Sequence, residues 1–103
     1  MSVEEVRKVW DEHLATRFPK ECIGEEIENI DLMLVDSFTT GCISTFIDRN
    51  GKLDLWRTAV LGRCYHDLAI VTNKIDGKAK DYFCRLEWLS EKVLKTVAQN
   101  AKY

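Results

Sequence analysis

The feature that most constrains the fold is a pair of long segments, residues 53–75 and 79–97, in which apolar side chains return every three or four positions. This spacing gives each segment one apolar face when it is coiled as an α-helix. Asp76 and Gly77 stand between the two segments and are typical of a tight joint between helices. The pattern therefore predicts two long helices that form an αα-hairpin.

A further helix is predicted at the start of the chain. Ser2 and Glu5 have the spacing of a capping box, in which each side chain satisfies a free backbone N–H of the other residue. Pro19 is expected to end this helix, because proline cannot continue the hydrogen-bond ladder. The residues expected to face inward are Val3, Val6, Val9, Trp10, Leu14 and Phe18.

Residues 30–47 carry a less regular pattern. The run from Ile30 to Val35 alternates as a strand does, but no partner strand is evident to satisfy its backbone groups. A helix that begins near Asp31 or Asp36 and continues to about Ile47 is the preferred interpretation. The residues expected to face inward are Leu34, Phe38, Cys42, Thr45 and Phe46.

Together these segments predict an all-α fold, an antiparallel four-helix bundle over residues 1–103 as a single helical domain. A chain of 103 residues with 46% hydrophobic and 31% charged residues can bury a core of its own. One proline and five glycines are too few for a many-stranded β-sandwich. Ser37, Gly41 and Ser44 or Thr45 form a row of small residues, and a close helix approach is predicted between Gly41 and Gly62.

The net charge of the chain indicates which classes of binding partner are unfavourable. A formal net charge of −2, with the charged residues spread evenly, gives no basic surface for nucleic acid or for an anionic membrane. No leader or spanning segment is evident, so a cytoplasmic location is expected. The four cysteines include no Cys-x-x-Cys pair and are expected to be buried thiols, and no cofactor is predicted.

One acidic set could bind Mg²⁺. Glu25, Glu28 and Asp31 are three residues apart and would share a face if this stretch were helical. Glu25-x-x-Glu28 resembles half of the motif with which all-helical nucleoside triphosphate pyrophosphohydrolases hold Mg²⁺, but the Glu-x-x-Asp pair of a later helix is missing. The resemblance implies an Mg²⁺-dependent phosphohydrolase as an alternative function.

A second polar set comes from the middle of the chain. Asp54 is expected to cap a helix and to pair with Arg57 three residues later. Arg57, His66 and Asp67 on this helix, together with Asp36, are candidates for one polar site, although no nucleophile with an orienting base is identifiable beside them. His13, on the flank of the first helix, is expected to be solvated or hydrogen-bonded to a neighbour.

Large aromatic residues suggest an interaction protein. Trp10, Trp56 and Trp88 occur once in each of three predicted helices and are candidates for interface anchors, particularly Trp56 and Trp88. The leading hypothesis is a non-enzymatic accessory module of the immunity type that acts as a homodimer, with an unidentified protein partner also possible. A small-molecule binder remains open, with an apolar cavity between the helices. The residues expected to line such a cavity are Phe38, Phe46, Val60 and Phe83.

Overall fold

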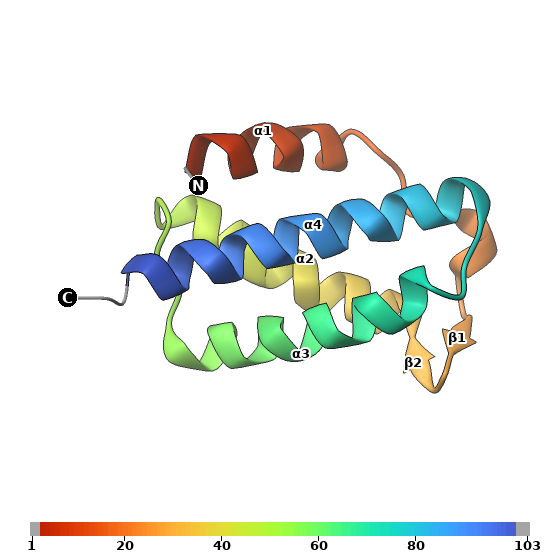
Figure 1. Cartoon of the computed structure of the whole chain (residues 1–103). Helices are drawn as coiled ribbons and strands as arrows, with labels where there is room; N and C mark the ends of the chain where they lie inside the picture. Colours follow the sequence, from red (N-terminus) through yellow and green to blue (C-terminus); the bar gives the residue numbers. More distant parts are fainter. Residues whose placement is uncertain (1–2, 101–103) are drawn as a thin grey trace.

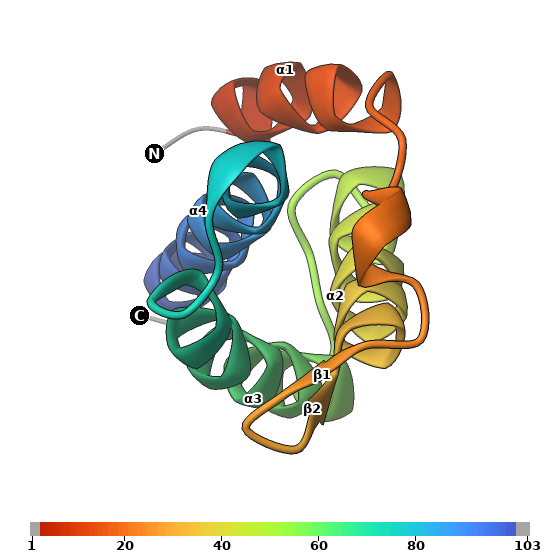
Figure 2. The same ribbon diagram turned by 90° about the vertical axis from the view of Figure 1, so that its right-hand side faces the viewer.

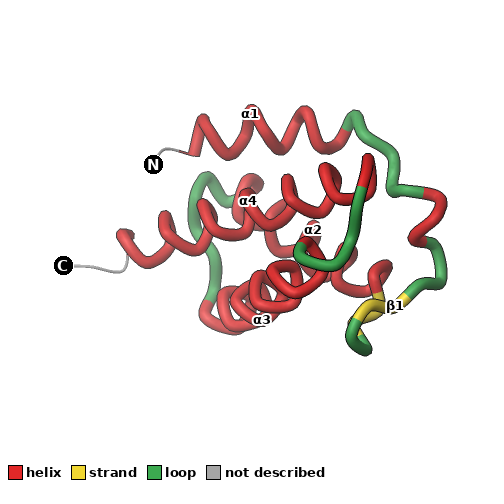
Figure 3. Tube along the Cα trace, turned by 45° about the vertical axis from the view of Figure 1, so that its right-hand side comes forward, coloured by secondary structure: helices red, strands yellow, loops and turns green. Residues whose placement is uncertain are grey.

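The computed structural model describes residues 3–100, which are mainly α-helical (Figure 1). The helices are α1 (Val3–Leu14), α2 (Leu32–Asp48), α3 (Leu55–Thr72) and α4 (Gly77–Asn100). Between α1 and α2 the chain forms a 3₁₀ turn, Lys20–Cys22, and two short strands, β1 (Glu26–Ile27) and β2 (Ile30–Asp31), as Figure 3 shows. The prediction of a helical fold is confirmed, with this small hairpin as an addition.

Helix α4 contacts each of the other three helices. It makes its most extensive contact with α3, and it also packs against α1 and α2. Figure 2 looks along the molecule and shows α1 and α3 on opposite sides of the interior, with α4 and α2 between them. No helix within residues 3–100 is long and apolar enough to cross a membrane.

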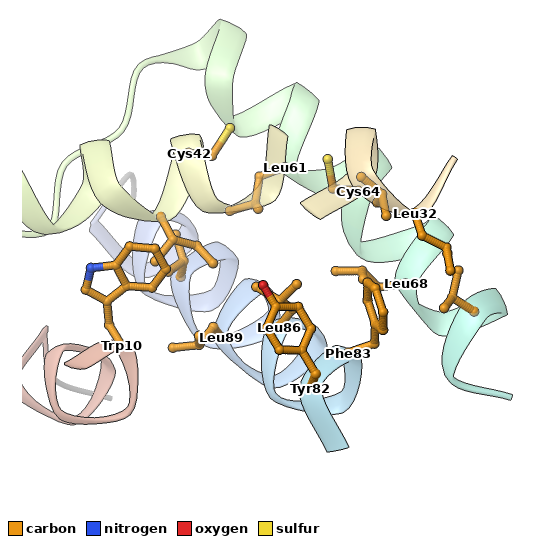
Figure 4. Close-up of a cluster of buried hydrophobic side chains, with 14 of the residues drawn as sticks. Trp10, Leu32, Cys42, Leu61, Cys64, Leu68, Tyr82, Phe83, Leu86 and Leu89 are labelled. Carbon is orange, nitrogen blue, oxygen red and sulfur yellow. The ribbon is translucent and has the colours of Figure 1, made fainter. Parts of the chain in front are cut away.

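The core lies where the four helices meet (Figure 4). Trp10 enters from α1, Leu61 from α3, and Phe83 and Leu86 from α4. Phe83, Leu61 and Leu86 are completely buried, and burying a side chain of this size stabilises the fold by roughly 1.5–3 kcal/mol. The largest fully buried side chains are Phe46, Phe83, Leu32, Ile43, Leu61, Leu68, Leu86, Leu89, Val6, Val71 and Val93, together with Thr39.

Short polar residues define where two helices begin. The Asp31 carboxylate accepts hydrogen bonds from the backbone N–H groups of Met33 and Leu34, each at 3.0 Å. Asp54 does the same for the N–H of Arg57 at 3.1 Å and pairs with its guanidinium at 2.8 Å. Of the two predicted starts of α2, Asp31 rather than Asp36 is the cap, and the prediction that Asp54 caps a helix is confirmed. Each side chain satisfies N–H groups that have no partner within the helix.

The first helix is shorter than predicted. It ends at Leu14 rather than at Phe18, and the Leu14 side chain is 63% exposed. The Phe18 ring instead reaches the core from the following loop, where it meets the rings of Tyr82 and Phe83 edge to edge. Ser2, the other half of the predicted capping box, lies outside the described residues.

The prediction for the inward face of α2 is confirmed at Cys42 and Phe46 and wrong at Leu34 and Phe38. Leu34 and Phe38 are 54% and 57% exposed, whereas Val35 and Thr39 face the core. Successive residues of a helix are turned by about 100°, so a shift of one position moves the buried stripe to a different face. Apolar residues occur on more than one side of α2, and the residues that α2 buries are Leu32, Val35, Thr39, Cys42, Ile43, Phe46 and Ile47.

The expectation that the Ile30 segment lacks a partner strand is also wrong. Strands β1 and β2 pair antiparallel, with Glu26 opposite Asp31 and Ile27 opposite Ile30. Glu28 and Asn29 form the turn with positive φ angles of 51° and 65°. Such angles are the geometry that a two-residue hairpin turn requires.

The predicted close approach at Gly41 and Gly62 is not observed. A Cβ atom built at either glycine would meet nothing within 4 Å, so neither position is needed for helix packing.

The prediction that the cysteines are buried thiols is confirmed for three of the four. Cys22, Cys42 and Cys64 are buried, Cys84 is half-buried, and all are free.

Gly51 is the glycine whose backbone matters most. Its φ angle is +97°, and a Cβ atom would lie 2.7 Å from Cγ2 of Val3. We predict that Gly51→Ala lowers the free energy of unfolding by about 2 kcal/mol, because alanine is strained at this φ angle and meets the first helix. Gly62→Ala is the matched control and should be neutral or stabilising by up to about 1 kcal/mol, since Gly62 lies within α3 with open space around it. Urea denaturation measures both, and a Gly51→Ala variant as stable as wild type would contradict the strain.

Candidate interaction groove

An open groove runs between α2 and α3. Its volume is about 920 Å³, and Asn29 and Ile30 of the β hairpin contribute to its lining. Figure 1 shows β1 and β2 beside the end of α3. Leu34 and Phe38 contribute from α2, and Trp56 and Val60 contribute from α3. The remaining lining residues are Asn29, Ile30, Asp31, Val35, Ser37, Gly41, Cys42, Thr45, Arg57, Arg63, Cys64 and Asp67.

The walls of the groove are apolar and accessible. Trp56 is 72% exposed, and Leu34 and Phe38 are also more than half exposed. A single exposed apolar side chain is common on protein surfaces, but several around one concavity are typical of a binding surface. The apolar rim therefore marks this groove as the candidate functional site.

The floor of the groove is formed by small residues and thiols. Gly41 leaves open space where a side chain would stand, and Cys42 and Cys64 lie deeper. The Cys42 thiol donates to the backbone carbonyl of Arg57 at 3.6 Å. Burial raises the pKa of both Cys42 and Cys64, so both thiols stay protonated at neutral pH and are poor nucleophiles.

Two charged groups of the groove cap a helix or form an ion pair, and two form no ion pair within residues 3–100. Asp31 caps α2, and Arg57 pairs with Asp54. Hydrogen bonds from the Arg57 side chain and backbone lower the pKa of Asp54, which keeps this carboxylate ionised. Arg63 and Asp67, one turn apart on α3, form no ion pair with any residue in the described part of the chain.

The three tryptophans predicted as interface anchors lie in different environments. Trp10 is in the core between α1 and α4. Trp88 is half-buried, and the Lys92 ammonium lies 5.5 Å from the centre of its ring. Only Trp56 of these three lines the groove, so it is the tryptophan best placed to anchor a partner.

The predicted cavity residues separate into two groups. Phe38 and Val60 line the groove between α2 and α3. Phe46 and Phe83 are completely buried in the core, where they contribute to packing. The structure therefore brings half of this set together, on the surface rather than inside the bundle.

Asp36, Arg57 and His66 do not meet in the structure. The Asp36 carboxylate accepts a hydrogen bond of 2.6 Å from the Tyr82 hydroxyl, and Arg57 is held by Asp54. His66 is exposed on α3. These three residues therefore serve separate parts of the fold.

The three acidic residues considered as Mg²⁺ ligands, Glu25, Glu28 and Asp31, do not share one surface in the structure. Glu25 precedes the hairpin, Glu28 lies in its turn and pairs with Lys74 at 3.8 Å, and Asp31 caps α2. The expected common helical face does not form, because this stretch is a hairpin. Within residues 3–100, no three His, Cys, Asp or Glu side chains come together as a metal site would require.

A buried polar cluster at α1 has no counterpart in the predictions beyond the hydrogen bond expected of His13. The His13 side chain is only 3% exposed, and its Nδ1 atom accepts a hydrogen bond of 2.9 Å from Nε of Arg85. The imidazole ring also packs against Trp10 and Tyr82. Because Nδ1 is the acceptor, the proton of the neutral ring is on Nε2, which is buried without a partner among the described residues.

Sequence periodicity alone could not have identified the groove. Periodicity places Leu34 in the core, and Arg63 and Asp67 carry no motif. The signal that is present in the sequence is the excess of apolar residues on α2, which is more than one buried face requires.

Neither a protein-family model nor a curated protein nor a solved structure matches this chain.

The His13 environment predicts a pH-dependent stability. Burial, and then the nearby Arg85 charge, lower the pKa of His13 from 6.5 to about 4, so the folded protein holds the ring neutral. The unfolded chain takes up this proton at higher pH than the folded chain does. Acid therefore favours unfolding between the two pKa values, and the stabilisation is complete only above pH 6.5.

We expect this single group to cost the wild type about 2 kcal/mol of unfolding free energy between pH 7.5 and pH 5. Other carboxylates also titrate, so His13→Gln is the reference. The difference in unfolding free energy between wild type and His13→Gln should shrink by that amount on going to pH 5, as measured by urea denaturation. A difference that is equal at both pH values would show that His13 is not held neutral.

Proposed function

We propose that this protein is a non-enzymatic interaction module that works as a homodimer through the groove between α2 and α3. The observation that carries this proposal is the exposure of three large apolar side chains, Leu34, Phe38 and Trp56, around one open groove. The proposal takes the scaffold to be an antiparallel four-helix bundle in which α3 and α4 form an αα-hairpin. An accessory role of the immunity type, in which the protein acts by presenting a surface, fits this arrangement.

The energetics of the rim support association. Covering a Phe, Leu or Trp side chain that was exposed contributes roughly 1.5–3 kcal/mol, and a symmetric dimer covers each of them twice. Association must exceed a cost of roughly 4–15 kcal/mol in lost translation and rotation. Leu34, Phe38 and Trp56 are 54%, 57% and 72% exposed, so covering them in both copies contributes roughly 5–11 kcal/mol, which exceeds the lower part of that range.

The polar groups of the groove support binding rather than catalysis. Cys42 and Cys64 are protonated thiols, Asp31 is occupied as a helix cap, and Arg57 is paired with Asp54. A covalent mechanism needs a nucleophile within hydrogen-bond reach of a base that a third group orients. The groups named here have structural partners in place of that arrangement.

A second candidate function uses the same groove. Its volume of about 920 Å³ lies in the range of pockets that bind small molecules, and its wall is apolar with a few polar groups. In this case Phe38 and Val60 would contact an apolar ligand instead of a second chain. Saturable binding of an anilinonaphthalene sulfonate dye by a monomeric wild type, lost in Phe38→Glu, would favour this candidate.

The homodimer is tested by the solution mass of wild type and one groove variant. Wild type should sediment as a dimer, and Phe38→Glu should weaken the dimer at least tenfold, because it places a carboxylate in the apolar contact. Leu14→Glu is the matched control, since Leu14 is similarly exposed but lies on α1 outside the groove. A wild type that is monomeric throughout the concentration range, or a Phe38→Glu variant that dimerises normally, would contradict the proposal.

A further inference from the structure

The groove has two unlike ends. Trp56 and Arg57 stand at the end where α3 begins. Ile30, Asp31 and Leu34 stand at the other end, beside the hairpin and the start of α2. The ion pair between Lys74 and Glu28 shows that the hairpin lies close to the residues that follow α3.

We infer that two copies pair groove to groove with their α3 helices reversed, so that Arg63 of each copy meets Asp67 of the other. This inference rests on the proposed homodimer and names the residues that select the second copy as partner. A two-fold axis that crosses α3 between Arg63 and Asp67 produces this contact twice. Arg63 and Asp67 are thus specificity-determining residues of the groove.

The charges of the groove favour a reversed copy over other partners. Arg63 is exposed, Asp67 is half-buried, and neither has an ion-pair partner in residues 3–100. A partner with charge of one sign would satisfy one of them and repel the other. A copy aligned in the same direction would set like charges against each other, whereas a reversed copy satisfies both.

The same two-fold axis also brings together apolar residues from the two ends of the groove. Trp56 is the most exposed of the large apolar residues that line the groove and stands at one end of it. A two-fold axis through the middle exchanges the ends, so that each Trp56 approaches the hairpin end of the other groove. There it would cover Ile30 and Leu34, an apolar contact for a residue type that often dominates binding energy at interfaces.

Two charge-reversal variants test the arrangement. In its own homodimer, Arg63→Glu should set the new carboxylate against Asp67 of the other copy, and Asp67→Lys should set the new ammonium against Arg63. Each variant alone is therefore expected to dimerise at least tenfold more weakly than wild type in sedimentation. An equimolar mixture should recover a dimer of mixed composition, because both cross-contacts then pair opposite charges. Native mass spectrometry of copies that differ in mass identifies it.

The outcomes separate this inference from the proposed function. If each variant dimerises like wild type, or if the mixture stays as weak as its components, the Arg63–Asp67 pairing is wrong. The homodimer itself still stands in that case, provided that Phe38→Glu dissociates it. A monomeric wild type would overturn both. Circular dichroism confirms that the variants are folded, and Arg63→Lys should remain dimeric. Should either reversal prevent folding, Arg63→Gln and Asp67→Asn replace them and should each weaken the dimer severalfold.

Discussion

The burial of one face of α4 against the other three helices is the constraint on which the rest of the structure depends. Tyr82, Phe83, Leu86, Leu89 and Val93 are buried along this helix, and α1, α2 and α3 each contribute side chains to the same core. Helices α2 and α3 pack against α4 and against each other. Their outer edges are then left without a covering element, and the groove is the result.

The bounds of α2 and the start of α3 could be predicted because they depend on local chemistry, whereas α1 ends at Leu14, before the predicted end at Phe18. Asp31 and Asp54 satisfy free N–H groups, and Gly51 adopts a positive φ after α2. The first half of the buried face of α2, where Val35 and Thr39 are buried instead of Leu34 and Phe38, could not be predicted. Helix α2 has apolar residues on more than one side, and the side that is buried depends on which side packs against the other helices. The spacing of apolar residues in the sequence carries no information on those contacts.

The candidate site could be predicted only in part for the same reason. Trp56 and Phe38 stand out in the sequence as large aromatic residues, but their place on one groove follows from the packing of two helices that are separate in sequence. Arg63 carries no signal until α3 has a defined outer side, whereas Asp67 is a polar-site candidate already in the sequence. His13 illustrates the opposite case, since a residue type that is usually hydrated is removed from water by the rings of Trp10 and Tyr82.

The attachment of α1 has a consequence for how the molecule opens. This helix packs mainly on α4, whereas α3 is held by both α2 and α4. Elements with fewer partners open in local fluctuations that cost less than global unfolding. Amide protons of α1 should therefore exchange with solvent well before those of α4, and each such opening would briefly hydrate the imidazole that the closed structure keeps dry. The contacts thus predict a three-helix centre that exchanges slowly and a first helix that opens more often.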